Sequence, residues 1–200
     1  MLKWEDVKDC VQARFINKAR NFRYLRTLPY KSFLNLTVVF YIETITKEGM
    51  TRGTLISRSI ARELGQNSER LFEQALKNLS SDDMCLLKFG DVAGVSEKSV
   101  DDMGMYVLTN KKKTLGSRLL LLKEVREKII QSLGEAVYVI PSSVHEILLV
   151  PVSKVQHTSD ELYKMVLEVN QTLHPMDVLA DSLYMLDLDG TLSLVHGGTE

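Results

Sequence analysis

The stretch Leu34-Asn35-Leu36-Thr37-Val38-Val39-Phe40-Tyr41-Ile42-Glu43 predicts a buried β-strand. It is rich in β-branched and aromatic residues, which pack well on the pleated surface of a sheet. Pro29 separates this strand from an amphipathic segment ahead of it, in which apolar residues recur at helical spacing: Val7, Val11, Phe15, Ala19 and Phe22. We therefore expect a helix over Val7–Leu25, followed by the strand.

The rest of the chain alternates between short strands and helices. Further strands are expected at 54–56, 85–89, 105–109, 118–122, 136–140 and 144–150. Helices are expected after Ser57, after Asn67, over 123–133 and after the capping box Thr158–Glu161. A strand, turn, strand and helix ending in Leu-Gly occur at 36–65 and again at 105–134. These patterns predict an α+β fold, a mostly antiparallel sheet with helices packed on it, and two similar βα lobes as its plan.

The chain divides into three parts by local composition. Residues 81–103 contain Asp82-Asp83, several serines and two glycines, and they are the least regular part of the sequence. We expect residues 1–80 to form a first lobe, made of the N-terminal helix, a β-hairpin and a helix. Residues 81–103 then form an irregular connecting segment, and residues 104–200 form a second α+β lobe that ends in a β-hairpin.

Composition limits the compartment. Hydrophobic residues make up 44% of the chain, which is ordinary for a globular protein. No apolar run approaches the ~20 residues that span a bilayer, and the early acids Glu5 and Asp6 differ from a secretory signal. Two cysteines, Cys10 and Cys85, show no metal-ligand spacing. We therefore expect no membrane segment and a location in the reducing cytoplasm.

One motif near the C-terminus points to an enzyme. Leu186-Asp187-Leu188-Asp189-Gly190-Thr191-Leu192 resembles the nucleophile motif of haloacid-dehalogenase-type phosphatases, whose two aspartates work beside a magnesium ion. That family needs an α/β domain after the motif, and only residues 193–200 follow it here. The alternative is a hairpin with strands at 183–188 and 191–195, because Asp-Gly favours a type I′ turn. We favour the hairpin and expect no phosphatase activity.

Charge is unevenly spread along the chain. Residues 10–42 contain six bases and no acid, whereas residues 155–200 contain eight acids and one base. The six bases are Arg14, Lys18, Arg20, Arg23, Arg26 and Lys31. Such a segment can bind nucleic acid or an acidic partner. Alternatively, the two ends of the chain lie together, and we favour this arrangement because it needs no partner and the whole chain is close to neutral. Phe15 and Phe22 belong to the apolar stripe and are expected to be buried, which argues against nucleic-acid binding.

The most reactive-looking side chains lie in Pro141–Glu146. Ser143 and His145 are the candidate catalytic residues, because a serine nucleophile needs a base within hydrogen-bonding reach. Glu146 points the opposite way on an extended chain and cannot orient the histidine. The alternative is a Pro-Ser-Ser turn whose hydroxyls satisfy backbone groups. Candidate binding residues are Arg14, Lys18, Arg23, Asn110, Ser142 and Glu146.

The sequence predicts neither a metal nor a cofactor. The four histidines lack ligand spacing; they are His145, His157, His174 and His196. The glycines form no phosphate-binding loop between a strand and a helix. The run Lys111–Lys113 is expected to be a solvated hairpin tip.

Four segments together resemble a known family. These are Leu28–Tyr30, Val38–Tyr41, Met105–Asn110 and Ile140–Ile147. They are similar to an uncharacterised bacterial family, known chiefly from gut anaerobes of the Firmicutes, that is described only as a domain of unknown function. The resemblance covers essentially the whole chain and implies no catalytic mechanism. Members often have a further region ahead of the opening helix, so we expect a short or shortened member.

These features favour a non-catalytic cytoplasmic α+β module that binds another protein. Two alternatives stay open. One is a hydrolase that uses Pro141–Glu146, and the other is a protein that binds nucleic acid through its basic N-terminal helix. The sequence does not indicate an oligomeric state.

Overall fold

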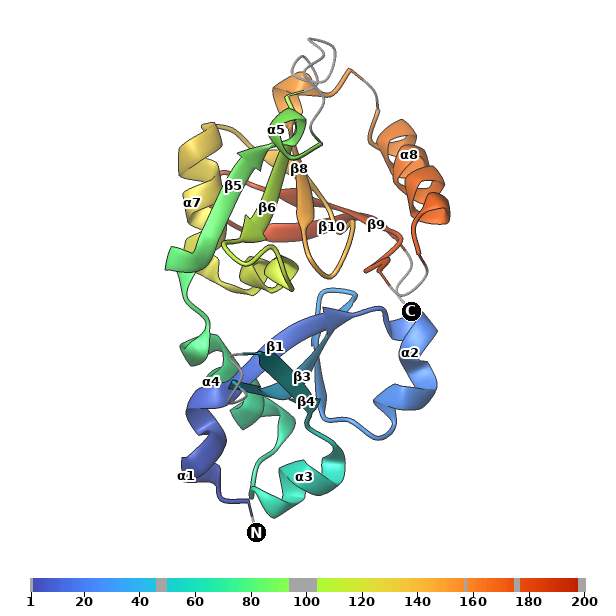
Figure 1. Ribbon diagram of the computed structural model, residues 1–200. Helices are drawn as coiled ribbons and strands as arrows, with labels where there is room; N and C mark the ends of the chain where they lie inside the picture. Colours follow the sequence, from blue (N-terminus) through green and yellow to red (C-terminus); the bar gives the residue numbers. More distant parts are fainter. Residues whose placement is uncertain (1, 46–49, 94–103, 157, 175–176, 198–200) are drawn as a thin grey trace. The chain divides into compact units, whose positions relative to one another are not determined.

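The computed structural model describes residues 2–45, 50–93, 104–156, 158–174 and 177–197. The chain divides into two compact units, Met1–Ser80 and Ser81–Glu200, each with its own sheet (Figure 1). Every strand pair among the described residues is antiparallel. The predicted α+β class is therefore confirmed.

The N-terminal unit is built around β3 (Leu36–Ile45), which is buried over its first seven residues. One edge of β3 pairs with β1 (Val11–Ile16), and the other edge pairs with β2 (Tyr30–Phe33) and β4 (Thr51–Leu55). The helices of this unit are α1 (Trp4–Val7), the 3-10 turn η1 (Lys8–Cys10), α2 (Lys18–Leu25), α3 (Arg58–Glu63) and α4 (Ser68–Asn78). The strand predicted over 34–43 is thus the centre of the sheet.

Two helices of this unit begin at the predicted caps. The Ser57 hydroxyl accepts from Ile60 N–H, and the Asn67 side chain accepts from Arg70 N–H. Each cap satisfies a backbone donor that the first turn of a helix leaves without a partner. The apolar side of α4 is buried at Leu71 and Ala75, as is Leu79 just after the helix, and α4 packs against β1.

The prediction of a single helix over Val7–Leu25 is wrong. The segment contains the end of α1, the turn η1, the strand β1 and the helix α2. A spacing of four residues equals two periods of a strand, so Val11 and Phe15 fit a strand as well as a helix. Ala13 lies between them, at 2% exposure, and completes the alternation of a half-buried strand. Asn17 ends the strand and caps α2 by accepting from Arg20 N–H at 2.9 Å.

The C-terminal unit contains a six-stranded sheet in the order β10-β9-β7-β8-β6-β5. Its strands are β5 (Met84–Lys88), β6 (Tyr106–Asn110), β7 (Val137–Ile140), β8 (Ile147–Pro151), β9 (Ser182–Leu186) and β10 (Leu192–Gly197). Its helices are α5 (Phe89–Ala93), α7 (Lys123–Leu133) and α8 (Ser159–Thr172). Three 3-10 segments connect them: η2 (Ser81–Asp83), η3 (Gly116–Leu121) and η4 (Val152–Lys154).

Helix α8 covers part of one sheet face. Its Leu162 and Val166 form a buried cluster with Ile140, Val150 and Leu183, and the predicted capping box at Thr158 and Glu161 is present. Met165 and Val169 of the same helix are 44% and 50% exposed. The apolar face of α8 is therefore wider than the part that touches the sheet.

Two expectations for this unit fail. The strand expected at 118–122 is the 3-10 segment η3, whose leucines are buried, because a short apolar run has no periodicity that separates a strand from a buried turn. The second copy of the proposed repeat therefore lacks its second strand. By contrast, the strand expected at 85–89 is present as the edge strand β5 (Met84–Lys88). Residues 94–103 of the expected connecting segment lie outside the described ones.

The aspartate motif forms a hairpin turn between β9 and β10, as we favoured, but the turn is not type I′. Gly190 N–H donates to Asp187 O, and Asp187 N–H donates to Thr191 O. Only Gly190, with φ +79°, has a positive φ within this loop, whereas a type I′ turn needs two such residues. The connection is a three-residue loop, a type I turn closed by a left-handed glycine.

Candidate functional site

Two loops of the C-terminal unit pack against each other, and we call residues 110–117 and 142–146 the loop junction. His145 joins them. Its carbonyl accepts from Gly116 N–H at 3.0 Å, and its ring Nδ1 accepts from Leu115 N–H at 3.2 Å. The lone pair of Nδ1 is therefore used by the backbone of the opposite loop.

Asn110 closes the first of these loops. Its exposed fraction is 5%, and its side chain donates to Thr114 O at 2.8 Å and accepts from Thr114 N–H at 3.1 Å. Inside the loop, Lys113 and Leu115 have φ values of 52° and 54°, a region that side chains other than glycine rarely adopt. Such backbone strain persists only where surrounding contacts enforce it. Asn110, a candidate binding residue, holds the shape of the loop.

The candidate nucleophile Ser143 also serves the backbone. Its Oγ accepts from His145 N–H at 3.1 Å and from Glu146 N–H at 3.2 Å. Among the described residues, the Ser143 hydroxyl and the His145 ring do not hydrogen-bond to each other, although a serine nucleophile needs a base at its hydroxyl. Ser142 and Glu146 are half-buried, and neither side chain has a hydrogen bond within the described part of the chain.

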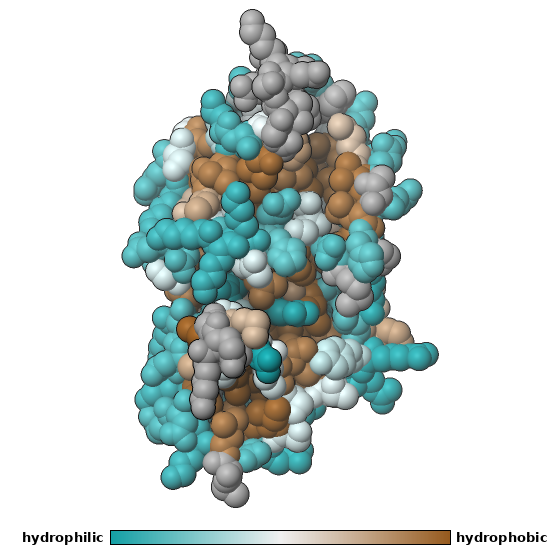
Figure 2. Space-filling view, in the orientation of Figure 1, coloured by the Kyte–Doolittle hydropathy of each residue, from teal (hydrophilic) through white to brown (hydrophobic). Residues whose placement is uncertain are grey.

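A different arrangement lies on α2. We call Lys18, Arg20, Phe22, Arg23, Tyr24 and Arg26 the α2 surface. The helix is anchored at its C-terminal end, because Leu25 and Leu28 are buried in a cluster with Ile16 and Val39. Figure 2 shows hydrophilic and hydrophobic side chains next to one another along the side of the N-terminal unit where α2 lies.

Two aromatic side chains of the α2 surface are open to solvent. Phe22 is 59% exposed and Tyr24 is 49% exposed. The prediction that Phe22 is buried is therefore wrong. The same prediction for Phe15 is correct, because Phe15 on β1 is fully buried. The Arg23 guanidinium lies 5.7 Å from the centre of the Phe22 ring, within the range of a cation–π contact. Leu25 is the one buried residue of the eight-residue helix α2. The rings of Phe22 and Tyr24 therefore stay exposed to solvent.

Cations surround these rings. Arg20, Arg23 and Arg26 are exposed, and Lys18 is half-buried. Arg58 of α3 adds another cation, since its Nε donates to Arg26 O at 3.0 Å. The α2 surface therefore combines at least four positive charges with two exposed rings.

The candidate Arg14 is not part of this surface. It lies on β1, where it pairs with Val39 across the sheet, and it is half-buried. Its buried Nε has no hydrogen-bond partner among the described residues. Lys31, another base of this stretch, forms an ion pair with Glu69 of the same unit. The predicted packing of the basic stretch against residues 155–200 joins the two units and stays a prediction.

Neither a metal centre nor a membrane span is found in the described part of the chain. Over the described ranges, no three His, Cys, Asp or Glu side chains are grouped as ligands for an ion. Of the four histidines, His157 lies outside these ranges, while His196 Nε2 lies 2.9 Å from Asp160 Oδ1. Among the helices described, none has the length and apolar character that crossing a bilayer requires.

Comparisons with known proteins give a family but no activity. The searches of curated proteins and of solved structures returned no match. A family model, described as a family of unknown function (DUF5688), matches residues 1–187. Since the match covers most of the chain, the chain belongs to this family of unknown function.

Proposed function

We propose that the chain is a non-catalytic binding module and that its N-terminal unit binds single-stranded nucleic acid through the α2 surface. The observation that carries the proposal is the exposure of Phe22 and Tyr24 beside Arg20, Arg23 and Arg26. Proteins that bind single strands combine a positively charged surface, which follows the phosphates, with aromatic side chains on which bases stack.

Charge supports the same partner. No acid occurs in residues 10–42, so nothing within this stretch repels a phosphate backbone. Neutralised phosphates release counterions, and binding of this kind weakens steeply as salt rises. An acidic protein would also be attracted to the cations, but it would not need stacking on Phe22.

The test measures fluorescence anisotropy of a labelled mixed-sequence single-stranded DNA and RNA as the protein and the salt are titrated. We expect binding that weakens with salt, is lost in Arg20→Glu/Arg23→Glu/Arg26→Glu, and weakens about tenfold in Phe22→Ala. The matched control is Lys111→Glu/Lys112→Glu/Lys113→Glu, which makes the same charge change in the C-terminal unit and should leave the affinity unchanged.

Three results would reject the proposal. One is equal loss in both triple variants, which indicates net charge alone. Another is unchanged affinity in Phe22→Ala, and the third is binding to poly-glutamate as tight as to the oligonucleotide, which indicates an acidic protein partner.

A protein partner, the module's expected ligand from sequence, is a second candidate function. It is supported by the exposed Met165 and Val169, four residues apart on α8 and therefore neighbours on one helix face. Cross-linking from a photoreactive residue at position 165 would test it, with the exposed position 171, on the other side of the same helix, as the control. Equal labelling at both positions in cells of the source organism would argue against it.

The hydrolase alternative has little support, because Ser143 and His145 both hydrogen-bond to backbone amides. A cytoplasmic location fits the two free cysteines, Cys10 and Cys85. Location and Firmicutes origin stay predictions.

A further inference from the structure

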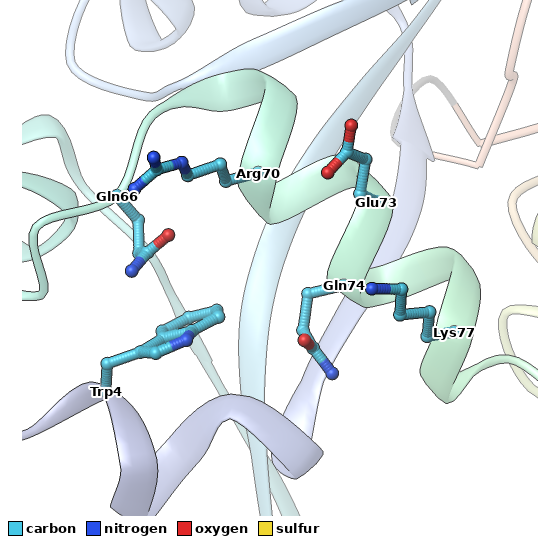
Figure 3. Close-up of a pocket in the computed structure, with 6 residues that line it drawn as sticks. All are labelled: Trp4, Gln66, Arg70, Glu73, Gln74 and Lys77. Atoms are coloured by element: carbon cyan, nitrogen blue, oxygen red, sulfur yellow. The ribbon is translucent and has the colours of Figure 1, made fainter.

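A hollow of about 360 Å³ lies in the N-terminal unit between α1 and α4. Five of its six lining residues carry polar or charged side chains and one is aromatic, and Figure 3 shows the aromatic ring on α1 and most of the others on α4. They are Trp4, Gln66, Arg70, Glu73, Gln74 and Lys77. None of them belongs to the α2 surface.

The sequence places these side chains on one side of α4. Positions 70, 73, 74 and 77 follow the spacing of one helix face, while Leu71 and Ala75 are fully buried on the other. Asn78 ties α4 to the segment that follows α1, since its Nδ2 donates to Lys8 O at 2.7 Å and to Val11 O at 2.8 Å. The hollow therefore has walls that the fold itself holds in place.

Several polar groups in the hollow have no partner within the described residues. Four groups make no hydrogen bond or ion pair with the described residues: the Trp4 indole N–H, the Arg70 guanidinium, the Glu73 carboxylate and the Lys77 ammonium. The amide of Gln74 donates to Asn78 at 2.9 Å, and its oxygen stays available as an acceptor. The hollow thus offers one aromatic face, two cations, one carboxylate and an amide oxygen.

We propose that this hollow binds a nucleoside phosphate. The base stacks on Trp4, since every nucleobase presents a flat face to an aromatic ring. Arg70 binds the phosphate through its planar fork of donors, and Lys77 adds a second positive charge. Glu73 accepts from ribose hydroxyls, as acidic residues do in dinucleotide-binding folds.

The volume of the hollow is suited to one nucleotide. A volume of about 360 Å³ is near the lower end of small-molecule sites, roughly 300–1,000 Å³. The nucleotide can come from two sources, either a free mononucleotide or one residue of a single strand. The proposal does not rest on the α2 surface, because the two sites share no residue.

The chain provides its own probe, since Trp4 is its single tryptophan. The test titrates the full chain with the four ribonucleoside monophosphates, with adenosine, with inorganic phosphate and with a short single-stranded oligonucleotide. Tryptophan fluorescence reports stacking, and calorimetry gives the affinities independently. We expect quenching by at least one nucleotide, weaker quenching by adenosine and none by phosphate alone.

Variants separate this site from non-specific binding. Arg70→Ala should weaken nucleotide binding about tenfold and bring its affinity down to that of adenosine, with Lys77→Ala as a second variant of the same kind. Arg62→Ala removes an exposed arginine from neighbouring α3 and should change nothing. Quenching by mononucleotides indicates a free nucleotide, and quenching by the oligonucleotide alone indicates a strand. No quenching by either, or equal effects of Arg70→Ala and Arg62→Ala, would overturn the proposal.

Discussion

The loop junction and the α2 surface both contain polar side chains of the kind that binding sites use, yet they differ in what those side chains contact. In the loop junction, the Asn110 side chain, the Ser143 hydroxyl and the His145 Nδ1 hydrogen-bond to the backbone. On the α2 surface, cations lie beside exposed aromatic rings. The comparison teaches that a chemically suggestive residue is best judged by its partners. Polar groups that already satisfy backbone amides support the fold, and exposed rings beside cations are available to a ligand.

The largest expected effect comes from two phenylalanines, seven residues apart. Phe15→Ala should lower the free energy of unfolding by about 3–5 kcal/mol, because Phe15 is fully buried on β1. Phe22→Ala should change it by less than about 0.5 kcal/mol, because Phe22 is 59% exposed. Chemical denaturation measures both. Equal losses would mean that Phe22 is a core residue and that the α2 surface does not exist.

The loop junction should be intolerant of added volume. A Cβ at Gly116 would lie 2.6 Å from Thr109 Oγ1 and 2.7 Å from His145 O. Gly116→Val should therefore cost about 3 kcal/mol or more in denaturant unfolding. Gly65→Ala is the control, because its Cβ meets nothing within 4 Å although φ is +66°, and we expect a loss of about 1 kcal/mol from backbone strain alone. A smaller loss at Gly116 than at Gly65 would refute the packed junction.

Removing a junction hydrogen bond should have an intermediate effect. Asn110→Ala should lower the free energy of unfolding by about 2 kcal/mol, since it removes the buried amide that makes both hydrogen bonds to the Thr114 backbone. Ser142→Ala removes a half-buried hydroxyl that has no hydrogen bond among the described residues, so its effect should stay below about 0.5 kcal/mol. Thermal and denaturant unfolding measure the stability of both variants. Equal stability of the two variants would place Asn110 among residues available to a ligand.

The smallest expected effect is on the dependence of folding stability on acid pH. The backbone N–H and the hydroxyl of Ser153 hydrogen-bond to Glu135 at 2.8 and 2.7 Å and hold the pKa of its carboxyl below the ordinary value of 4.5. A carboxylate with a lowered pKa in the folded state contributes stability above its unfolded pKa and loses it as pH falls through the folded pKa. Glu135→Gln should therefore reduce the fall in denaturation midpoint below pH 4.5.

Glu168→Gln on the exposed side of α8 is the matched control, and it should keep the parent's dependence on pH. If Glu135→Gln and the parent lose stability in parallel as pH falls, the Ser153 contacts do not matter to the folded state.

Local chemistry explains which elements were predicted from the sequence. The caps at Ser57 and Asn67, the capping box at Thr158 and the left-handed Gly134 that ends α7 each depend on a few neighbouring residues. The β1–α2 segment was mispredicted because spacings of four fit both a helix and a strand. The buried η3 was mispredicted because its leucines form a run without a period.

The candidate sites depended on contacts between residues distant in sequence. Ser143 and His145 were reasonable candidates by residue type, but Leu115 and Gly116, which bind His145, lie about 30 residues earlier in the chain. No local pattern indicates that contact. Phe22 was assigned to a buried stripe because a single helix was predicted over Val7–Leu25. That error also hid the exposure of the α2 surface. Shortening the helix at Asn17, a good capping residue, could have revealed it.

Hydrogen exchange with and without a single-stranded oligonucleotide, at low salt, tests the central comparison most directly. We predict that added oligonucleotide protects the amides of residues 18–26 and leaves residues 110–117 and 142–146 unchanged. Protection of the loop junction with no change on α2 would contradict the account, because the ligand would then bind where the polar groups already have partners.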